Sequence, residues 1–224
     1  MTTPAPSDDK RIAVWTDFRG VLTPPLKSTL KHYCQHREFT PAQLNEALHA
    51  VARMHNMPDA MAVLDSGVLN EEDWLASISQ ELAAQFNIID ALDGFRDDWW
   101  GDRRINSDWV KQLRQLRDAG AFVGVVSNLP AEWKMPFSEA LAPYEFDHIA
   151  VSCDLGFRKP DWQMFAHLSE VAGVSPAKSI LVDDLTANIA GAHAVGWKAY
   201  HFTDDSADAA QFCRTVMNQE EGTL

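Results

Sequence analysis

Three observations predict a doubly wound α/β fold with a parallel sheet and an inserted helical domain. Short, continuous apolar runs recur along the chain, as expected for strands that are buried on both faces of a parallel sheet. Helical patterns separate most of these runs, and alternating strands and helices are typical of βαβ units. One long stretch after the first run contains no such strand signal, which predicts an insertion.

The apolar runs predict five strands, at residues 12–16, 123–126, 149–151, 180–182 and 199–202. Three of the runs stop directly before a polar residue, namely Asp17, Ser127 or Asp183. Ligands of open α/β sheets bind beyond the carboxyl ends of the strands. We therefore expect these side chains, together with Asp184, to converge in one crevice.

The helical patterns complete the predicted core. Apolar residues recur at helical spacing over 109–116, and Gly120 follows as a stop signal. Residues 161–172 and 186–194 are also predicted helices, the second capped by Thr186. Between residues 24 and 104 the sequence is helical throughout, with segments near 41–55 and 71–86. The predicted domains are therefore a core of residues 1–23 and 105–224 and a helical insertion of residues 24–104.

Composition excludes several classes of function. The net charge of −13 would repel a phosphate backbone, so we expect no nucleic-acid partner. No apolar run approaches the length of a membrane span, and residues 1–11 lack the apolar segment of an export signal. Three cysteines without close pairing fit a reducing compartment. We expect a cytoplasmic protein, either a monomer or a homodimer, that does not bind membranes.

The residues at the predicted strand ends suggest a specific chemistry. A carboxylate such as Asp17 can act as a covalent nucleophile, but attack on a phosphate requires a cation between the two negative groups. Mg²⁺ prefers oxygen ligands, which Asp17, Asp183 and Asp184 offer. Ser127 and the neighbouring Asn128 can bind a phosphoryl oxygen. Lys159, in a loop before a predicted helix, can neutralise charge shared between nucleophile and transferring group.

Four short motifs give these residues a family resemblance. Asp17-Phe-Arg-Gly-Val-Leu-Thr resembles the first motif of the haloacid dehalogenase (HAD) superfamily, whose usual form is Asp-x-Asp-Gly-Thr/Val-Leu. The other three motifs, in family order, are Ser127-Asn128, Arg158-Lys159-Pro160-Asp161 and Leu181-Val182-Asp183-Asp184. Together they cover the predicted core. The resemblance implies a HAD-like, Rossmann-like core and, for the insertion, a C1-type helical cap.

Site roles follow from the resemblance, residue by residue. Asp17 would be the nucleophile and a Mg²⁺ ligand, Asp184 a direct ligand, Asp183 a ligand through water, and the backbone carbonyl of Arg19 a further ligand. Lys159 would orient the nucleophile and the phosphoryl group. Substrate contacts would come from Phe18, Ser127 and Asn128. We interpret Arg158 as a surface residue and the histidines of the insertion, His49 among them, as exposed.

Arg19 departs from the family pattern. Its position usually holds the aspartate that acts as general acid/base, and arginine stays protonated at neutral pH. Three hypotheses follow. The chain is a Mg²⁺-dependent phosphatase for a small phosphorylated metabolite that uses a substitute acid, water or a good leaving group. It is a metal-independent hydrolase acting on carbon, as haloacid dehalogenases are. Or it is a non-catalytic binder or regulator, in which Arg19 pairs with Asp183 or a bound anion. We favour the first.

Overall fold

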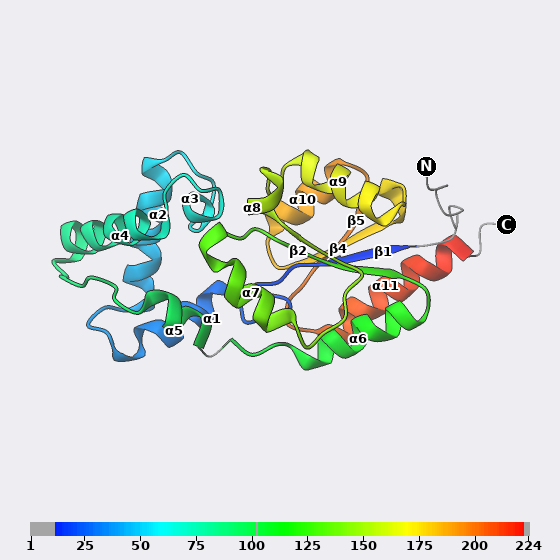
Figure 1. Cartoon of the computed structure of the whole chain (residues 1–224), viewed down its shortest axis with the longest axis horizontal. Coiled ribbons are helices and arrows are strands. Elements are labelled where there is room, and N and C mark those ends of the chain that lie inside the picture. The colour runs from blue at the N-terminus through cyan, green and yellow to red at the C-terminus, as the bar shows by residue number, and fades with distance from the viewer. Residues whose placement is uncertain (1–11, 102, 222–224) are drawn as a thin grey trace.

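A five-stranded parallel sheet forms the centre of the molecule, and a group of helices lies to one side of it (Figure 1). The computed structural model describes residues 12–101 and 103–221. The strand order is β3-β2-β1-β4-β5, which confirms the predicted fold class. The strands are β1 Ala13–Thr16, β2 Phe122–Ser127, β3 His148–Val151, β4 Ser179–Asp183 and β5 Lys198–His201.

Helices cover both faces of this sheet (Figure 1). Val14 faces the layer formed by α6 (Ser107–Asp118) and α11 (Ser206–Glu221), whereas Trp15 faces α9 (Trp162–Ala172) and α10 (Thr186–Ala194). Because consecutive residues of β1 enter two different apolar layers, the whole strand is buried. This double burial explains why the strands read as continuous apolar runs.

The stretch between β1 and α6 is helical, as the sequence predicted. Its helices are α1 Leu26–Tyr33, α2 Pro41–Met54, α3 Ala62–Asp65, α4 Glu71–Phe86 and α5 Phe95–Gly101. A capping box between Thr40 and Gln43 starts α2, and Leu48 and Ile78 are fully buried where α2 packs against α4. We call residues 24–104 the insert; its status as a separate domain stays a prediction.

Aromatic side chains join the insert to the core. Trp99 lies 5.3 Å from the ring of Trp133, and Phe95 stacks on Trp99. Trp133 directly precedes α7 (Lys134–Leu141), which follows β2, while α8 (Ser152–Leu155) follows β3. This packing places the insert beyond the carboxyl ends of the strands, on the side where the motif residues lie (Figure 1).

One predicted cap is wrong. Leu185, not Thr186, is the N-cap of α10, and no side chain caps this helix. Instead the Asp183 carboxylate accepts a hydrogen bond from the Leu185 backbone N–H at 2.9 Å. Thr186 is therefore the first residue of the helix and not its cap, and the helix is tied directly to the end of β4.

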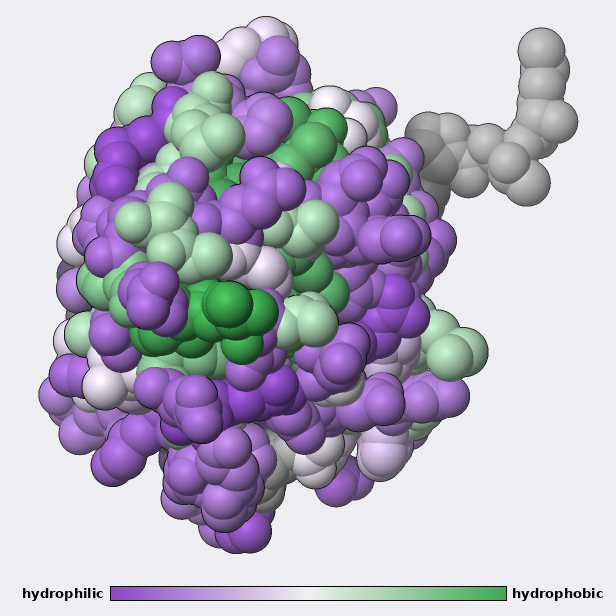
Figure 2. All heavy atoms as spheres, turned by 90° about the vertical axis from the view of Figure 1, so that its left-hand side faces the viewer, coloured by the Kyte–Doolittle hydropathy of each residue, from purple (hydrophilic) through white to green (hydrophobic). Residues whose placement is uncertain are grey.

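No helix among the described residues is both long enough and apolar enough to cross a bilayer. The end of the molecule formed by the insert is largely hydrophilic, with hydrophobic side chains gathered in a patch near the middle of the face (Figure 2). The interpretation of residues 1–11 lies outside the described part of the chain.

Candidate active site

Three carboxylates meet at the carboxyl ends of two neighbouring strands. Asp17 follows β1, and Asp183 and Asp184 lie at the end of β4, which pairs with β1 in parallel register. The backbone N–H of Asp17 continues this pairing by donating to the Val182 carbonyl at 2.8 Å. One oxygen from each carboxylate lies within 4.8 Å of the others. The structure thus brings together the three acidic residues that the sequence assigned to one metal site.

Lys159 bridges two of these carboxylates. Its Nζ atom donates to Asp17 Oδ1 and to Asp183 Oδ2, both at 2.6 Å, and its side chain is 1% exposed. Asn128 fixes the lysine from the end of β2, because its side-chain amide exchanges two 2.9 Å hydrogen bonds with the Lys159 backbone. The second and third motifs are therefore joined by direct contact.

Burial sets the protonation behaviour of the cluster. Burial, together with the charges of Asp183 and Asp184, raises the pKa of Asp17 to about 7, although Lys159 acts in the opposite direction. The pKa of Asp184 is raised by burial and by Asp183. Burial by itself would lower the pKa of Lys159, but the Asp17 and Asp183 carboxylates outweigh it and raise this pKa. The site therefore holds more negative charge than its single buried lysine balances.

Asp183 differs from Asp184 in its hydrogen bonding. The Asn188 amide lies 3.0 Å from both oxygens of Asp183, which also bind Lys159 and the Leu185 backbone N–H. Four donor contacts hold this carboxylate rigidly inside the protein. Asp184 is only partly buried and faces the loop after β1. Of the two adjacent aspartates, Asp184 is thus the more open to a ligand.

Gly20 makes room for Asp184. Its backbone has φ +94°, a left-handed conformation that favours glycine, and a Cβ atom at this position would overlap the Asp184 carboxylate. Hydrogen bonds from Gly20 N to Thr23 O and from Thr23 N to Phe18 O, both 2.8 Å, close the loop on itself. The glycine of the first motif is therefore required by both backbone conformation and close packing.

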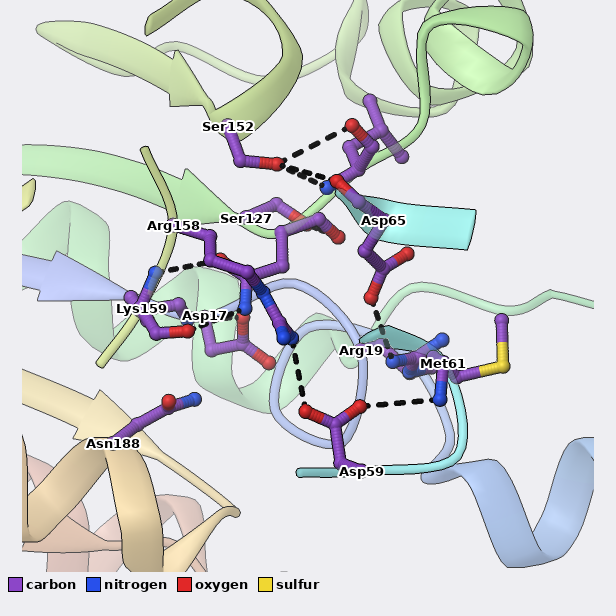
Figure 3. A network of polar contacts seen from close by, with 12 residues as sticks. Asp17, Arg19, Asp59, Met61, Asp65, Ser127, Ser152, Arg158, Lys159 and Asn188 are labelled. Carbon is purple, nitrogen blue, oxygen red and sulfur yellow. Dashed lines mark hydrogen bonds and ion pairs between the residues drawn. The ribbon is translucent and has the colours of Figure 1, made fainter. Parts of the chain in front are cut away.

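A cavity of about 230 Å³ opens onto this cluster and is bounded on its far side by the insert (Figure 3). Arg19 reaches into it and forms an ion pair with Asp65 of α3, with Arg19 Nη2 3.8 Å from Asp65 Oδ2. The core side of the lining consists of Asp17, Arg19, Ser127, Asn128, Arg158, Lys159, Asp184, Leu185 and Asn188, and the insert contributes Leu26, His49, Asp59, Ala60, Met61 and Asp65.

Two interpretations of single residues are wrong. Arg158 is not a surface residue: its side chain is 12% exposed, lines the cavity and donates to Asp59 Oδ2 at 3.0 Å. His49 is half-buried and also lines the cavity. Both errors share a cause, because the insert folds back over the core and covers side chains that would otherwise face solvent.

Phe18 does not line the cavity. Its ring is buried and packs edge-on against Phe137 at 4.7 Å and near Trp100 of the insert at 5.9 Å. It lies at the boundary between core and insert. Because the ring is enclosed by other aromatic groups, the structure gives it a packing role in place of the expected substrate contact.

Asp59 and Asp65 are site residues that the sequence did not reveal. Asp59 accepts from the Met61 backbone N–H at 3.1 Å as well as from Arg158, and Asp65 is 4% exposed. Burial raises the pKa of Asp65 to about 6, against the opposing effect of Arg19. The sequence did contain a signal for Asp65. This residue directly follows the apolar run 60–64, just as Asp17 follows the run 12–16.

Comparison with known proteins places these features in a family. A model of haloacid dehalogenase-like hydrolases matches residues 13–196. The sesquiterpene phosphatase astK of Aspergillus oryzae is 33% identical over 117 residues, which are 52% of this chain and 60% of that protein. The chain thus matches less than two thirds of that relative's length.

Solved structures share the fold. A HAD family enzyme of Bacteroides thetaiotaomicron, in complex with magnesium and inorganic phosphate, has a TM-score of 0.55 at 18% identity and covers 89% of this chain and 98% of its own. An L-2-haloacid dehalogenase of Xanthobacter autotrophicus with covalently bound chloropropionic acid has a TM-score of 0.62 at 16% identity. The match covers 89% of this chain and 80% of the dehalogenase chain. With the family model spanning most of the sequence and all four motifs, the chain belongs to the haloacid dehalogenase-like hydrolases.

Proposed function

We propose that this hydrolase is a Mg²⁺-dependent phosphatase that acts on a small phosphorylated metabolite through an aspartyl-phosphate intermediate. The observation that carries the proposal is the cluster of Asp17, Asp183 and Asp184, whose carboxylate oxygens lie within 4.8 Å of one another. Adjacent buried carboxylates are costly unless a cation compensates them, and Lys159 supplies only one positive charge.

The donor set fits Mg²⁺. Magnesium takes oxygen ligands, usually one or two carboxylates together with waters and substrate oxygens. Asp17 and Asp184 would hold the ion directly, the backbone carbonyl of Arg19 would add a ligand, and Asp183 would act through water because its oxygens already accept four hydrogen bonds. Bound there, Mg²⁺ would neutralise phosphate charge and keep the carboxylates ionised.

The geometry supports the remaining roles that we propose. Lys159 holds Asp17 by Oδ1, and we assign Oδ2 to the attack on phosphorus. A bond forms between this oxygen and phosphorus as the bond to the leaving group breaks, and water later hydrolyses the aspartyl phosphate. Ser127 and Asn128, which line the same cavity, would bind the phosphoryl oxygens.

The insert would act as the cap that controls access. Two ion pairs link it to the core at the cavity, Arg19 with Asp65 and Arg158 with Asp59. The cavity of about 230 Å³ is below the roughly 300–1,000 Å³ typical of small-molecule sites. We therefore propose that the insert moves away to admit substrate and closes over it again.

The sequence relative supports a phosphatase, whereas the structural neighbours include both a phosphate-bound enzyme and a dehalogenase. One relative is a sesquiterpene phosphatase, and one structural neighbour was solved with magnesium and phosphate. A metal-independent dehalogenase would have little need for the carboxylate cluster. For a regulator, Arg19 was expected to pair with Asp183 or a bound anion, but its ion-pair partner is Asp65 of the insert.

A screen of phosphorylated metabolites with Mg²⁺, run on the wild type and on Asp17→Asn, tests the proposal. We expect phosphate release by the wild type that stops in excess EDTA and is lost in Asp17→Asn. Activity that survives the substitution would remove Asp17 from the role of nucleophile. Halide release from 2-haloacids in EDTA would favour the dehalogenase instead, and inertness towards every substrate would favour a binding protein.

A further inference from the structure

Hydrolysis of a phosphoester with a poor leaving group requires a proton donor, which the first motif does not supply. We propose that Asp65, at the end of α3 in the insert, is the general acid/base of this enzyme and takes the place of the aspartate that Arg19 replaces. This inference rests on the proposed phosphatase function. Under this inference, the insert contributes a residue that contacts the reacting atoms.

Asp65 has a carboxylate oxygen available to a substrate. The residue is 4% exposed and lines the same cavity as Asp17 and Lys159. Among the described residues, its Oδ2 atom has no hydrogen-bond partner. Arg19 Nη2 lies 3.8 Å away, close enough for an ion pair but too far for a hydrogen bond. A buried polar atom usually finds a partner, and here a leaving-group oxygen would provide it.

The other carboxylates of the cavity are already engaged. Asp17 is the proposed nucleophile and Asp184 the proposed metal ligand. Both oxygens of Asp59 accept hydrogen bonds, Oδ1 from Met61 N and Oδ2 from Arg158. Of the carboxylates that line the described cavity, Asp65 is the one with neither a proposed role nor a full set of bonds.

A second cavity offers room for the leaving group. A groove of about 620 Å³ runs between the insert and the core and shares Asp65 and Arg158 with the catalytic cavity. Its apolar lining comes from both parts, with Met57, Pro58 and Leu69 on the insert and Pro130, Ala131 and Phe157 on the core. Because the two cavities share Asp65 and Arg158, a substrate with phosphorus at Asp17 and its organic group in this groove would have its bridging oxygen near these two residues.

The proton balance is complete without another reactant. As the Asp17–phosphorus bond forms and the ester bond breaks, the Asp65 carboxyl proton goes to the leaving oxygen, which departs as an alcohol. Asp65 is then a carboxylate. It takes a proton from the water that attacks the aspartyl phosphate, which releases phosphate and restores both aspartates.

Two substrates distinguish an acid from a structural residue. p-Nitrophenyl phosphate has a leaving group that departs without a proton, whereas octyl phosphate needs one. We expect Asp65→Asn to lower kcat/KM for octyl phosphate by about 10²-fold or more and to lower it for p-nitrophenyl phosphate by much less. The value of kcat/KM depends only on the steps up to ester cleavage. The ratio of kcat/KM for the two substrates, measured on one enzyme preparation, does not depend on the fraction of that preparation that is folded.

Asp59→Asn is the matched control, because it also removes an ion pair between insert and core. It should change kcat/KM for both substrates by the same factor. In Asp65→Asn, the second substitution Arg19→Asp should restore hydrolysis of octyl phosphate by returning a carboxyl group to the usual family position.

Equal losses for the two substrates in Asp65→Asn, or no loss, would overturn the inference, as would a wild type that hydrolyses p-nitrophenyl phosphate but not octyl phosphate. A wild type that hydrolyses neither substrate with Mg²⁺, or an Asp17→Asn variant that hydrolyses both, would refute the underlying phosphatase function, and the role of Asp65 with it.

Discussion

Replacing Lys159 by methionine tests the electrostatics of the site. The lysine is 1% exposed and is the buried cation shared by Asp17 and Asp183, at 2.6 Å from each. Methionine retains most of the volume but leaves two carboxylates without their counter-charge. Removing one partner of a buried ion pair typically costs about 3–5 kcal/mol, since the remaining charge is no longer compensated. We expect the free energy of unfolding to fall by an amount in this range. Protonation of Asp17 sets the upper limit, because a neutral Asp17 no longer needs a counter-charge.

Urea unfolding at neutral pH in EDTA measures this loss. The matched control is Lys134→Met, which removes an ion pair of similar length, 2.7 Å to Asp154, between two side chains that are half exposed. Its unfolding midpoint should stay close to that of the wild type, because solvent screens exposed pairs. Saturating Mg²⁺ should reduce the deficit of Lys159→Met, since an ion that binds the native state stabilises it. A loss below about 1 kcal/mol in EDTA would contradict the buried-pair argument.

Three other perturbations have defined outcomes. Gly20→Ala should weaken Mg²⁺ binding at least tenfold by isothermal titration calorimetry, because the new methyl group displaces the Asp184 carboxylate; unchanged affinity would mean that this carboxylate is not a ligand. Because burial raises the pKa of Asp65 to about 6, ionising Asp65 costs folding stability as pH rises from about 4 through 6. In EDTA, the stability of Asp65→Asn relative to wild type should therefore increase across that interval, and a flat or falling difference would contradict the shift. Trp109→Phe removes a 2.9 Å hydrogen bond to buried Thr16 and should cost about 1–3 kcal/mol by urea unfolding.

The core of the site was predictable because its residues stand at the ends of strands. A buried strand gives a continuous apolar run, and a carboxylate that follows one is conspicuous, as Asp17 and Asp183 are. The parallel sheet then brings such ends together without any further information. The strand boundaries were predicted to within one residue for the same reason.

The part of the site contributed by the insert was not predictable in this way. Asp65 lies on α3, a helix of four residues that is too short to show a periodic pattern. Its position in the cavity that Asp17 also lines depends on how the insert packs against the core, through contacts such as Trp99 with Trp133. The same packing encloses Arg158 and Phe18, whose neighbours in space are remote in sequence. Tertiary packing of this kind leaves no local signal in the amino-acid order.

The lysine of the third motif has a consequence for how the enzyme would acquire its metal. Because Lys159 already joins Asp17 to Asp183, both carboxylates of the proposed Mg²⁺ site are held in place by the fold itself. Binding of the proposed ion would then require no rearrangement of these two side chains.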